Sequence, residues 1–218
     1  MEAEEFFRQG LALLNINLTD NAVKNCLQYC TELQKWNQRI NLIARNTTLK
    51  EIIEKHFLDS LTLLPVIRQY GSPGNSLLDV GTGAGFPGMV LAAVDGDLQV
   101  TLVEPRQKRV SFLKHIIRTL QLSNVTVVEK RLEDADHLAT GSFTFITCRA
   151  VAEALIFLPM IREILGIKTI VILMQGKVGK ESRLSGNLAY EYELLDNQEF
   201  RLPFSGSSRC LELVQLRA

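Results

Sequence analysis

The chain has 218 residues, 46% of them hydrophobic and 22% charged, which is the composition of an ordinary globular protein. Its 24 basic and 24 acidic side chains cancel, so the overall charge supplies no attraction for nucleic acid. No apolar run approaches the roughly 18 residues of a membrane span, and the acidic start, MEAEEFFRQG, does not resemble a leader peptide. We expect a cytoplasmic protein that does not enter a membrane, with one domain and a smaller extension.

The N-terminal part of the chain carries the pattern of amphipathic helices. Apolar residues recur at three- and four-residue steps over residues 22–36, and capping side chains precede them at residues 19–21. A second apolar stripe covers residues 52–64, and GSPGNS, residues 71–76, is rich in turn formers. We therefore expect an N-terminal helical extension, residues 1–70, that ends at this turn.

The main domain, residues 71–218, alternates short apolar strands with helices. Such alternation predicts parallel strands joined by right-handed crossovers. The expected strands are SLLDV, VTLVE, VTVVE, FTFIT and TIVILM, and the expected helices cover residues 87–94, 105–121 and 151–165. YEYELL and CLELVQLR, separated by a turn-rich segment, predict a hairpin at the sheet edge. The predicted fold class is α/β, a Rossmann-like, doubly wound and mostly parallel seven-stranded sheet.

Several reactive residue types are interpreted as structural. The four cysteines lack a C-x-x-C pair and a nearby histidine, so we expect buried thiols and no bound metal. His56, Asp59 and Ser60 resemble parts of a hydrolase site, but they share one helical turn and lack a nucleophile turn. Because His56 lies on the apolar stripe, we interpret it as a locally bonded core histidine, and we expect Trp36 to pack against the main domain.

The glycine-rich segment LLDVGTGAGFPG, residues 77–88, follows the first predicted strand and opens a helix. Ligands of open α/β sheets bind at this position, where Gly81, Gly83 and Gly85 let a ligand approach the backbone. Glu104 ends the second strand nineteen residues beyond Gly85, where a carboxylate can accept from both hydroxyls of a ribose. The alternative is that Glu104 caps the next helix or pairs with Lys108. The spacing favours a cofactor that contains adenosine.

Two cofactor classes fit this loop. Residues 83–88 satisfy the G-x-G-x-x-G pattern, which indicates an NAD(P)-dependent oxidoreductase. Asp79, two positions before Gly81, is unfavourable beside a pyrophosphate but attracts the ammonium and sulfonium groups of S-adenosylmethionine. Alternatively, Asp79 is a buried strand-end residue bonded to the loop amides. No catalytic Tyr-Lys or His-Asp set is evident for an oxidoreductase, so methyl transfer is the preferred interpretation.

Over residues 20–180 the chain resembles a known family through several motifs in order. WNQRINLI, HFLDSL, LLDVGTGAGFPG, KRVSFL, RLED and CRA are similar to segments of the bacterial small-subunit rRNA guanine-N7 methyltransferases, the RsmG or GidB family. The resemblance implies a class I methyltransferase fold with S-adenosylmethionine as cofactor. It also implies that N7 of guanine 527 in 16S rRNA, within the small ribosomal subunit or its assembly intermediate, accepts the methyl group.

The resemblance also implies site residues. It places cofactor contacts at the following positions of this chain: Gly81, Phe86, Leu132, Glu133 and Arg149. Arg149 is the candidate catalytic residue, which either holds the cofactor or donates to the guanine edge; the alternative is an ion pair with Asp79 or Glu104. The chain departs from the family pattern at Gln175, where a lysine is usual, with Lys177 two positions later.

Basic residues gather over residues 105–128, a segment without Asp or Glu. Such a patch attracts phosphate through counterion release, although a solvated helix face is the alternative. The candidate RNA contacts are Arg106, Lys108, Arg109 and Lys177. A non-enzymatic RNA-binding protein with a methyltransferase fold is therefore a further hypothesis. We expect the protein to be a monomer.

Overall fold

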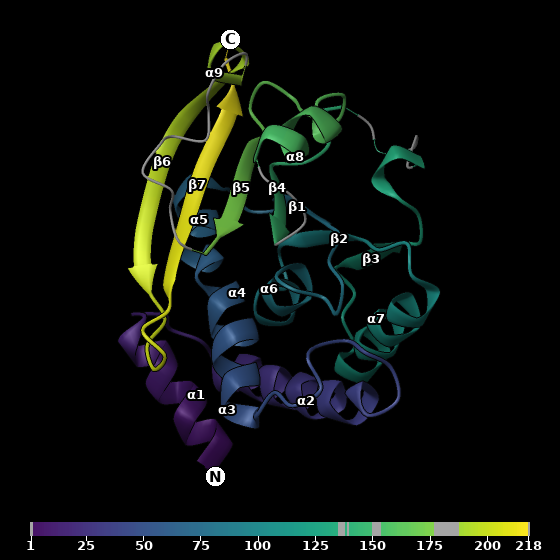
Figure 1. Cartoon of the computed structure of the whole chain (residues 1–218), viewed down its shortest axis with the longest axis vertical. Coiled ribbons are helices and arrows are strands. Elements are labelled where there is room, and N and C mark those ends of the chain that lie inside the picture. Colours follow the sequence, from purple (N-terminus) through teal and green to yellow (C-terminus); the bar gives the residue numbers. More distant parts are fainter. Residues whose placement is uncertain (1, 135–137, 139, 150–153, 177–187, 218) are drawn as a thin grey trace.

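The computed structural model describes all residues except 1, 135–137, 139, 150–153, 177–187 and 218 (Figure 1). The elements are α1 (Glu2–Leu13), α2 (Asp20–Asn37), α3 (Leu49–Ile52), the π-helix η1 (Ile53–Leu58), α4 (Asp59–Leu61), α5 (Leu63–Tyr70), β1 (Ser76–Val80), α6 (Gly88–Val94), β2 (Gln99–Val103), α7 (Gln107–Leu120), β3 (Val125–Val128), the 3-10 helix η2 (Leu132–Asp134), β4 (Phe145–Arg149), α8 (Ala154–Ile161), β5 (Ile170–Gln175), α9 (Leu188–Glu191), β6 (Tyr192–Arg201) and β7 (Ser208–Leu216).

The strands form one seven-stranded sheet in the order β3-β2-β1-β4-β5-β7-β6. The strands β1 to β5 pair in parallel, whereas β7 runs antiparallel to both β5 and β6. This sheet confirms the predicted Rossmann-like α/β fold and the C-terminal hairpin at its edge. The strand order reverses at β1, which pairs with β2 on one side and β4 on the other. A ligand crevice is expected at the carboxyl ends of these strands.

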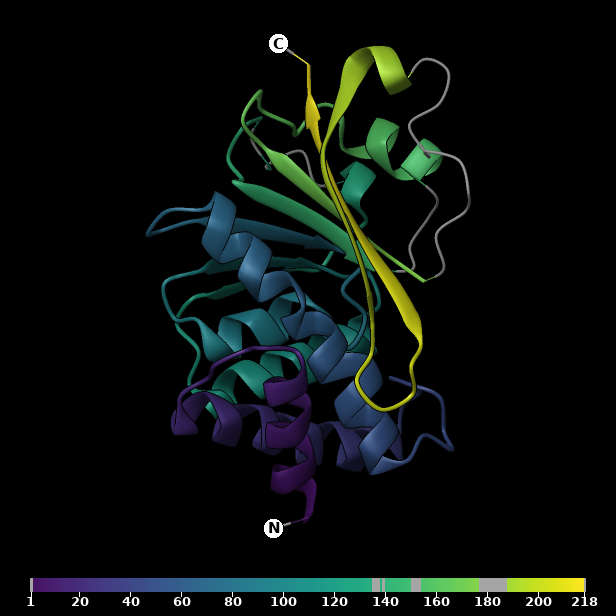
Figure 2. The same ribbon diagram turned by 90° about the vertical axis from the view of Figure 1, so that its left-hand side faces the viewer.

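Helices cover both faces of the sheet (Figure 2). One apolar core lies between the sheet and a layer that includes α2, α5, α6 and α7. The other face packs against α8 through Phe157, Leu158 and Ile161, all 0% exposed. The predicted helix over residues 151–165 is shorter than expected where it is described, because α8 ends at Ile161. Its residues 151–153 lie outside the described residues.

The N-terminal helices share a core with the sheet. Thr19 caps α2 as expected, since its hydroxyl accepts from the Ala22 N–H at 3.2 Å. Tyr29 of α2 is 0% exposed, and Trp36 packs on Phe112 of α7 with ring centroids 5.5 Å apart, as predicted. Apolar side chains of residues 1–70 and of residues 71–218 meet in one core. This shared core does not separate the two parts, so the division of the chain into two units stays a prediction.

The hairpin of β6 and β7 reaches the N-terminal helices, as Figures 1 and 2 both show. The Phe204 ring at its tip stacks on Phe6 of α1, with centroids 4.0 Å apart. The Glu54 carboxylate accepts from the backbone N–H groups of Phe204 and Ser205 at 2.8 and 2.7 Å. The last two strands are therefore fixed to the first helices.

The second apolar stripe forms a helix that is not regular. A π-helix, Ile53–Leu58, interrupts it, and the Asp59 N–H donates to the Glu54 carbonyl five residues back. The apolar side chains of Ile53 and Leu58 are five residues apart and both at most 1% exposed. This spacing matches the wider turn of a π-helix, a feature that is frequent at functional sites.

Candidate active site

The glycine loop lies between β1 and α6 at the carboxyl edge of the sheet. Gly81, Gly83 and Gly85 have φ angles of 68°, 63° and 93°, in the left-handed region that favours glycine. A Cβ on Gly83 would meet only ordinary contacts, so this residue is open to a ligand, whereas a Cβ on Gly85 would collide with the Tyr29 hydroxyl. The Tyr29 hydroxyl also donates to the Ala84 carbonyl. The absent Cβ of Gly85 therefore serves packing against α2.

Asp79 is buried completely at the end of β1. Its Oδ2 accepts from the Thr82 hydroxyl at 2.6 Å and from the Gly88 N–H at 2.8 Å. One oxygen thus fixes the loop to the start of α6, which is the structural role considered for this residue. Its Oδ1 is buried without a hydrogen-bond partner among the described residues. Burial raises the pKa of Asp79 to about 6, and a cation beside Oδ1 would stabilise the charged form of this carboxylate.

Glu104 connects the loop to α7. Its carboxylate, 2% exposed, accepts from the Gly83 N–H at 3.1 Å and from the Arg106 N–H at 2.8 Å. Arg109 Nη1 lies 3.4 Å from Oε2, so the basic partner is Arg109 and not the expected Lys108. The Arg106 N–H belongs to the residue just before α7, so Glu104 fixes the approach to this helix and, among the described residues, does not bond to an N–H within it. The bond to the Gly83 N–H also holds the Glu104 carboxylate next to Gly83, which is open to a ligand.

Arg149 ends β4 and is held from several sides. Its Nη1 donates to the Lys55 carbonyl at 3.2 Å, and its Nη2 lies 3.1 Å from His56 Nδ1. The guanidinium carbon lies 5.0 Å from the centroid of the Phe86 ring, in cation–π geometry. Its carboxylate neighbour among the described residues is Asp59, with Oδ2 at 3.9 Å from Nη1.

The ion pair considered for Arg149 in the sequence was therefore assigned to the wrong carboxylates. Neither Asp79 nor Glu104 forms a salt bridge with Arg149 in the described part of the chain. Asp59 takes this place, although it lies ninety residues earlier in the sequence. Asp59 also accepts from Arg209 Nε of β7 at 2.9 Å.

His56 belongs to this group and is more than a local core residue. Its ring stacks on Phe86 with centroids 4.9 Å apart. Burial, followed by the charge of Arg149, lowers the pKa of His56 to about 3. The imidazole is therefore neutral at physiological pH. Because a guanidinium only donates, Nδ1 is the acceptor in the contact with Arg149.

The π-helix explains how one short segment supplies three contacts to Arg149. In a regular α-helix the Asp59 N–H would take the Lys55 carbonyl as its partner. Here it donates to the Glu54 carbonyl instead, and the Lys55 carbonyl accepts from Arg149. The wider turn thus directs the Lys55 carbonyl, the His56 ring and the Asp59 carboxylate toward β4.

The remaining predicted residues lie at or near the same edge. Leu132 is buried and Glu133 exposed in η2, the short helix after β3. Arg106 and Lys108 are exposed at the start of α7, as expected for phosphate contacts. Arg109 instead turns its guanidinium to Glu104, and Lys177 lies outside the described residues. The structure therefore brings the cofactor candidates together but leaves the RNA surface only partly described.

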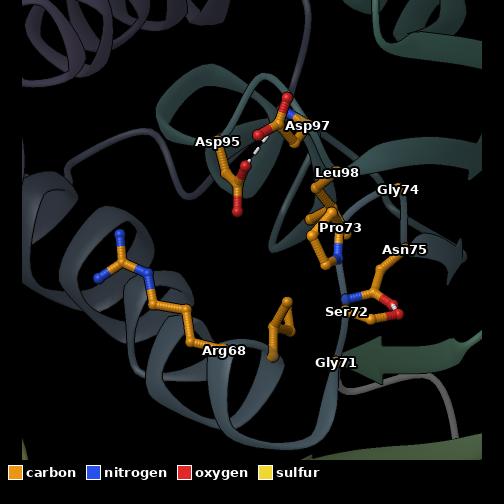
Figure 3. A pocket seen from close by; sticks show the side chains of 10 residues that line it. Arg68, Gly71, Ser72, Pro73, Gly74, Asn75, Asp95, Asp97 and Leu98 are labelled. Atoms are coloured by element: carbon orange, nitrogen blue, oxygen red, sulfur yellow. Dashed lines mark hydrogen bonds between the residues drawn. The ribbon is translucent and has the colours of Figure 1, made fainter.

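A separate cavity of about 230 Å³ lies at the opposite edge of the sheet (Figure 3). The turn before β1 and the loop before β2 form it, so it is at the amino ends of these strands. Two polar pairs in its wall bond each other: Ser72 with Asn75, and the Asp97 N–H with Asp95. The cavity is therefore distinct from the glycine loop.

Two further expectations concern metals and membranes. Over the described residues, no cluster of three or more His, Cys, Asp or Glu side chains has the arrangement of a metal site. Within the same part of the chain, no helix has the length and apolar character needed to cross a bilayer. The four cysteines are buried, and burial raises the pKa of the Cys148 thiol to about 12.

Residues 22–204 match the family model described as rRNA small subunit methyltransferase G. The ribosomal RNA small subunit methyltransferase G of Desulfotalea psychrophila is 39% identical over 211 residues, 95% of this chain and 95% of that protein. The proteins of this name from Syntrophus aciditrophicus and Geotalea uraniireducens are 35% identical. They cover 94% and 98% of this chain, and the aligned parts are 86% and 96% of their own lengths.

Solved structures share the fold at low sequence identity. TYW2 from M. jannaschii, crystallised in complex with AdoMet, is 16% identical with a TM-score of 0.54, over 71% of this chain and 76% of that one. A SAM dependent methyltransferase from Aquifex aeolicus is 16% identical with a TM-score of 0.52, over 72% and 92%. These similarities confirm the predicted Rossmann-like methyltransferase fold.

We expect the substitution His56→Asn to make stability less sensitive to acid. The folded-state pKa of His56, about 3, lies below the ordinary value of 6.5, so unfolding takes up a proton between these values. Stability that is complete above pH 6.5 is therefore lost as the pH falls toward 3, by about 1.4 kcal/mol per pH unit for one proton. Asn keeps an acceptor for Arg149 but does not titrate.

Denaturant unfolding of wild type and His56→Asn from about pH 4 to about pH 7.5 measures this difference directly. Other titrating groups, including Asp79, affect both proteins equally and cancel in the comparison. A free-energy difference that stays constant over this range would contradict a neutral, buried His56.

Proposed function

This chain belongs to the rRNA small subunit methyltransferase G family, and we propose that it methylates N7 of guanine 527 in 16S rRNA with S-adenosylmethionine. The observation that carries the proposal is the glycine loop at the end of β1, where the buried Asp79 leaves Oδ1 without a partner among the described residues. A positively charged ligand fits this oxygen, whereas the negative pyrophosphate of NAD(P) would be repelled by a charge of the same sign. The oxidoreductase alternative is not favoured.

The glycine loop and Glu104 fit the methionine and ribose parts of the cofactor. We assign the ammonium of the methionine moiety to Asp79 Oδ1 and the backbone approach to Gly81 and Gly83. Glu104, held at the Gly83 N–H, accepts from the ribose hydroxyls.

The adenine end lies at the carboxyl end of β3. We assign Leu132 and Glu133 of η2 to the adenine edge, where a backbone amide and a carboxylate can meet its polar atoms. The absent Cβ of Gly85 makes room for the Tyr29 hydroxyl. The guanidinium of Arg149 lies over the ring of Phe86.

The reaction needs alignment more than proton transfer. S-Adenosylmethionine, when bound, supplies a methyl group that is activated by a sulfonium. Guanine N7 has an in-plane lone pair and no proton, so no general base is required. Residues that hold the guanine in line with the methyl group and exclude water therefore account for catalysis.

Arg149 is the residue we assign to the guanine. Its guanidinium is anchored by Lys55, His56 and Phe86, and it donates to O6 of the base, an acceptor next to N7. Donation to O6 fixes the ring while N7 stays free to react. Arg106, just before α7, and Lys108 on α7 supply phosphate contacts, and Lys177 is assigned to the same surface.

The substrate is the small ribosomal subunit or its assembly intermediate in the cytoplasm, and the enzyme acts as a monomer. A guanine within folded RNA has to leave its stack before it reaches a buried arginine, as in other enzymes that modify bases. The salt dependence of binding then reports the phosphate contacts.

The test of this function is to map methyl incorporation on small subunits that lack the modification. With tritiated S-adenosylmethionine, we expect one methyl group per subunit, located at N7 of guanine 527 by reverse transcription after cleavage at 7-methylguanine. Arg149→Ala should lower turnover by about 100-fold or more while thermal unfolding stays cooperative. Methylation elsewhere would contradict the assigned target, and full activity of Arg149→Ala would contradict its role. Binding without methyl incorporation would favour a non-enzymatic RNA-binding protein.

We expect Asp79→Asn to weaken cofactor binding and to remove its pH dependence. The Asn amide oxygen can still accept from Thr82 and Gly88, so the loop is retained, but the negative charge beside the ammonium is lost. Because the pKa of Asp79 is about 6, wild-type affinity should rise as the pH increases through 6 and then level off.

Calorimetric titration with S-adenosylhomocysteine measures both effects. At neutral pH the variant should bind about 10-fold more weakly, which corresponds to about 1.4 kcal/mol. Its affinity should change little from about pH 5 to about pH 7. Equal affinities and equal pH profiles for the two proteins would show that Asp79 serves the loop alone.

A further inference from the structure

We propose that Asp59 is a positioning residue that holds Arg149 in place by neutralising the repulsion between Arg149 and Arg209. The inference rests on the proposed function, because Arg149 is assigned there to the guanine. Asp59 contacts both arginines and is only 4% exposed. It therefore acts through them and does not contact the substrate.

The sheet brings the two arginines to one face, on either side of β5. Arg149 is in register with Met174 of β5, and Met174 is in register with Leu211 of β7. Arg209 is two residues before Leu211 and so points to the same face. Asp59, at the end of the π-helix, reaches both: Oδ1 lies 2.9 Å from Arg209 Nε, and Oδ2 lies 3.9 Å from Arg149 Nη1.

The charges explain why one carboxylate matters here. Both guanidinium side chains are 22% exposed, so water screens their mutual repulsion incompletely. The backbone carbonyl of Lys55 and the neutral ring of His56 accept hydrogen bonds from Arg149, but neither acceptor carries a charge. Among the described residues, Asp59 supplies the largest attraction to the charge of Arg149, ahead of the buried Asp79. Without it, two like charges on the strands that flank β5 would push the flexible guanidinium of Arg149 out of its position over Phe86.

Glu54 provides a matched control on the same π-helix. Its residue exposure, 4%, equals that of Asp59, but its carboxylate accepts from the backbone of Phe204 and Ser205. It therefore fixes the β6–β7 hairpin and contacts neither arginine in the part of the chain that the structure describes. A loss that is merely structural should appear in both Asp59→Asn and Glu54→Gln.

The experiment compares kcat and KM of wild type, Asp59→Asn and Glu54→Gln on undermodified small subunits, with thermal unfolding of each. For Asp59→Asn we expect kcat to fall about 10- to 100-fold, because a displaced Arg149 would no longer hold the guanine in line with the methyl group. We expect its KM for S-adenosylmethionine to stay within about threefold of the wild-type value. Glu54→Gln should lower the melting temperature but keep kcat within about threefold.

A double-mutant cycle with Arg209→Gln tests the electrostatic cause. If Asp59 neutralises the pair, Asp59→Asn should cost at least about threefold less in kcat in the Arg209→Gln background than in the wild type. Should Asp59→Asn alone not fold, the double variant should still show kcat within about threefold of Arg209→Gln.

Three results would overturn the inference: an unchanged kcat for Asp59→Asn, an equal fall in kcat for Glu54→Gln, or equal costs in the two backgrounds. An inactive wild type would instead contradict the proposed function, so the two failures are distinguishable.

Discussion

A single buried carboxylate at the end of β1 fixes the loop on which the proposed site is built. Asp79 Oδ2 binds the Thr82 hydroxyl and the Gly88 N–H, and these two bonds set the path of the chain from strand to helix. Of the left-handed glycines between them, Gly83 keeps the ligand side of the loop free of a side chain, and Gly85 makes room for Tyr29. Because the other oxygen stays without a partner among the described residues, the interaction that shapes the loop also leaves a charge for the cofactor.

The N-terminal helices complete the site from the other side. Tyr29 supports the loop at Ala84, and the π-helix supplies Lys55, His56 and Asp59 to the vicinity of Arg149. The sheet alone would leave this arginine without the Asp59 carboxylate, its ion-pair partner among the described residues. The helices before residue 71 therefore hold Arg149 as well as contributing to the core, and the contacts of Glu54 with the hairpin tip fix these helices to the last two strands.

Local patterns in the sequence predict the elements well, but not the contacts that join distant segments. The alternation of strands and helices, the Thr19 cap and the glycine loop are confirmed, because each depends on neighbouring residues. The partners of Arg149 lie 93 and 94 residues away, and Arg209 lies 150 residues from Asp59. The second apolar stripe did not predict the π-helix that brings them together. The contact of Arg109 with Glu104 is likewise not evident from the sequence, and the RNA contact of Arg109 stays a prediction.

The most direct measurement is a calorimetric titration of the wild-type protein with S-adenosylhomocysteine and, separately, with NADH. The account predicts saturable binding of the sulfur nucleoside at one site and no heat of binding for the dinucleotide. Saturable binding of NADH, together with no binding of S-adenosylhomocysteine, would contradict it.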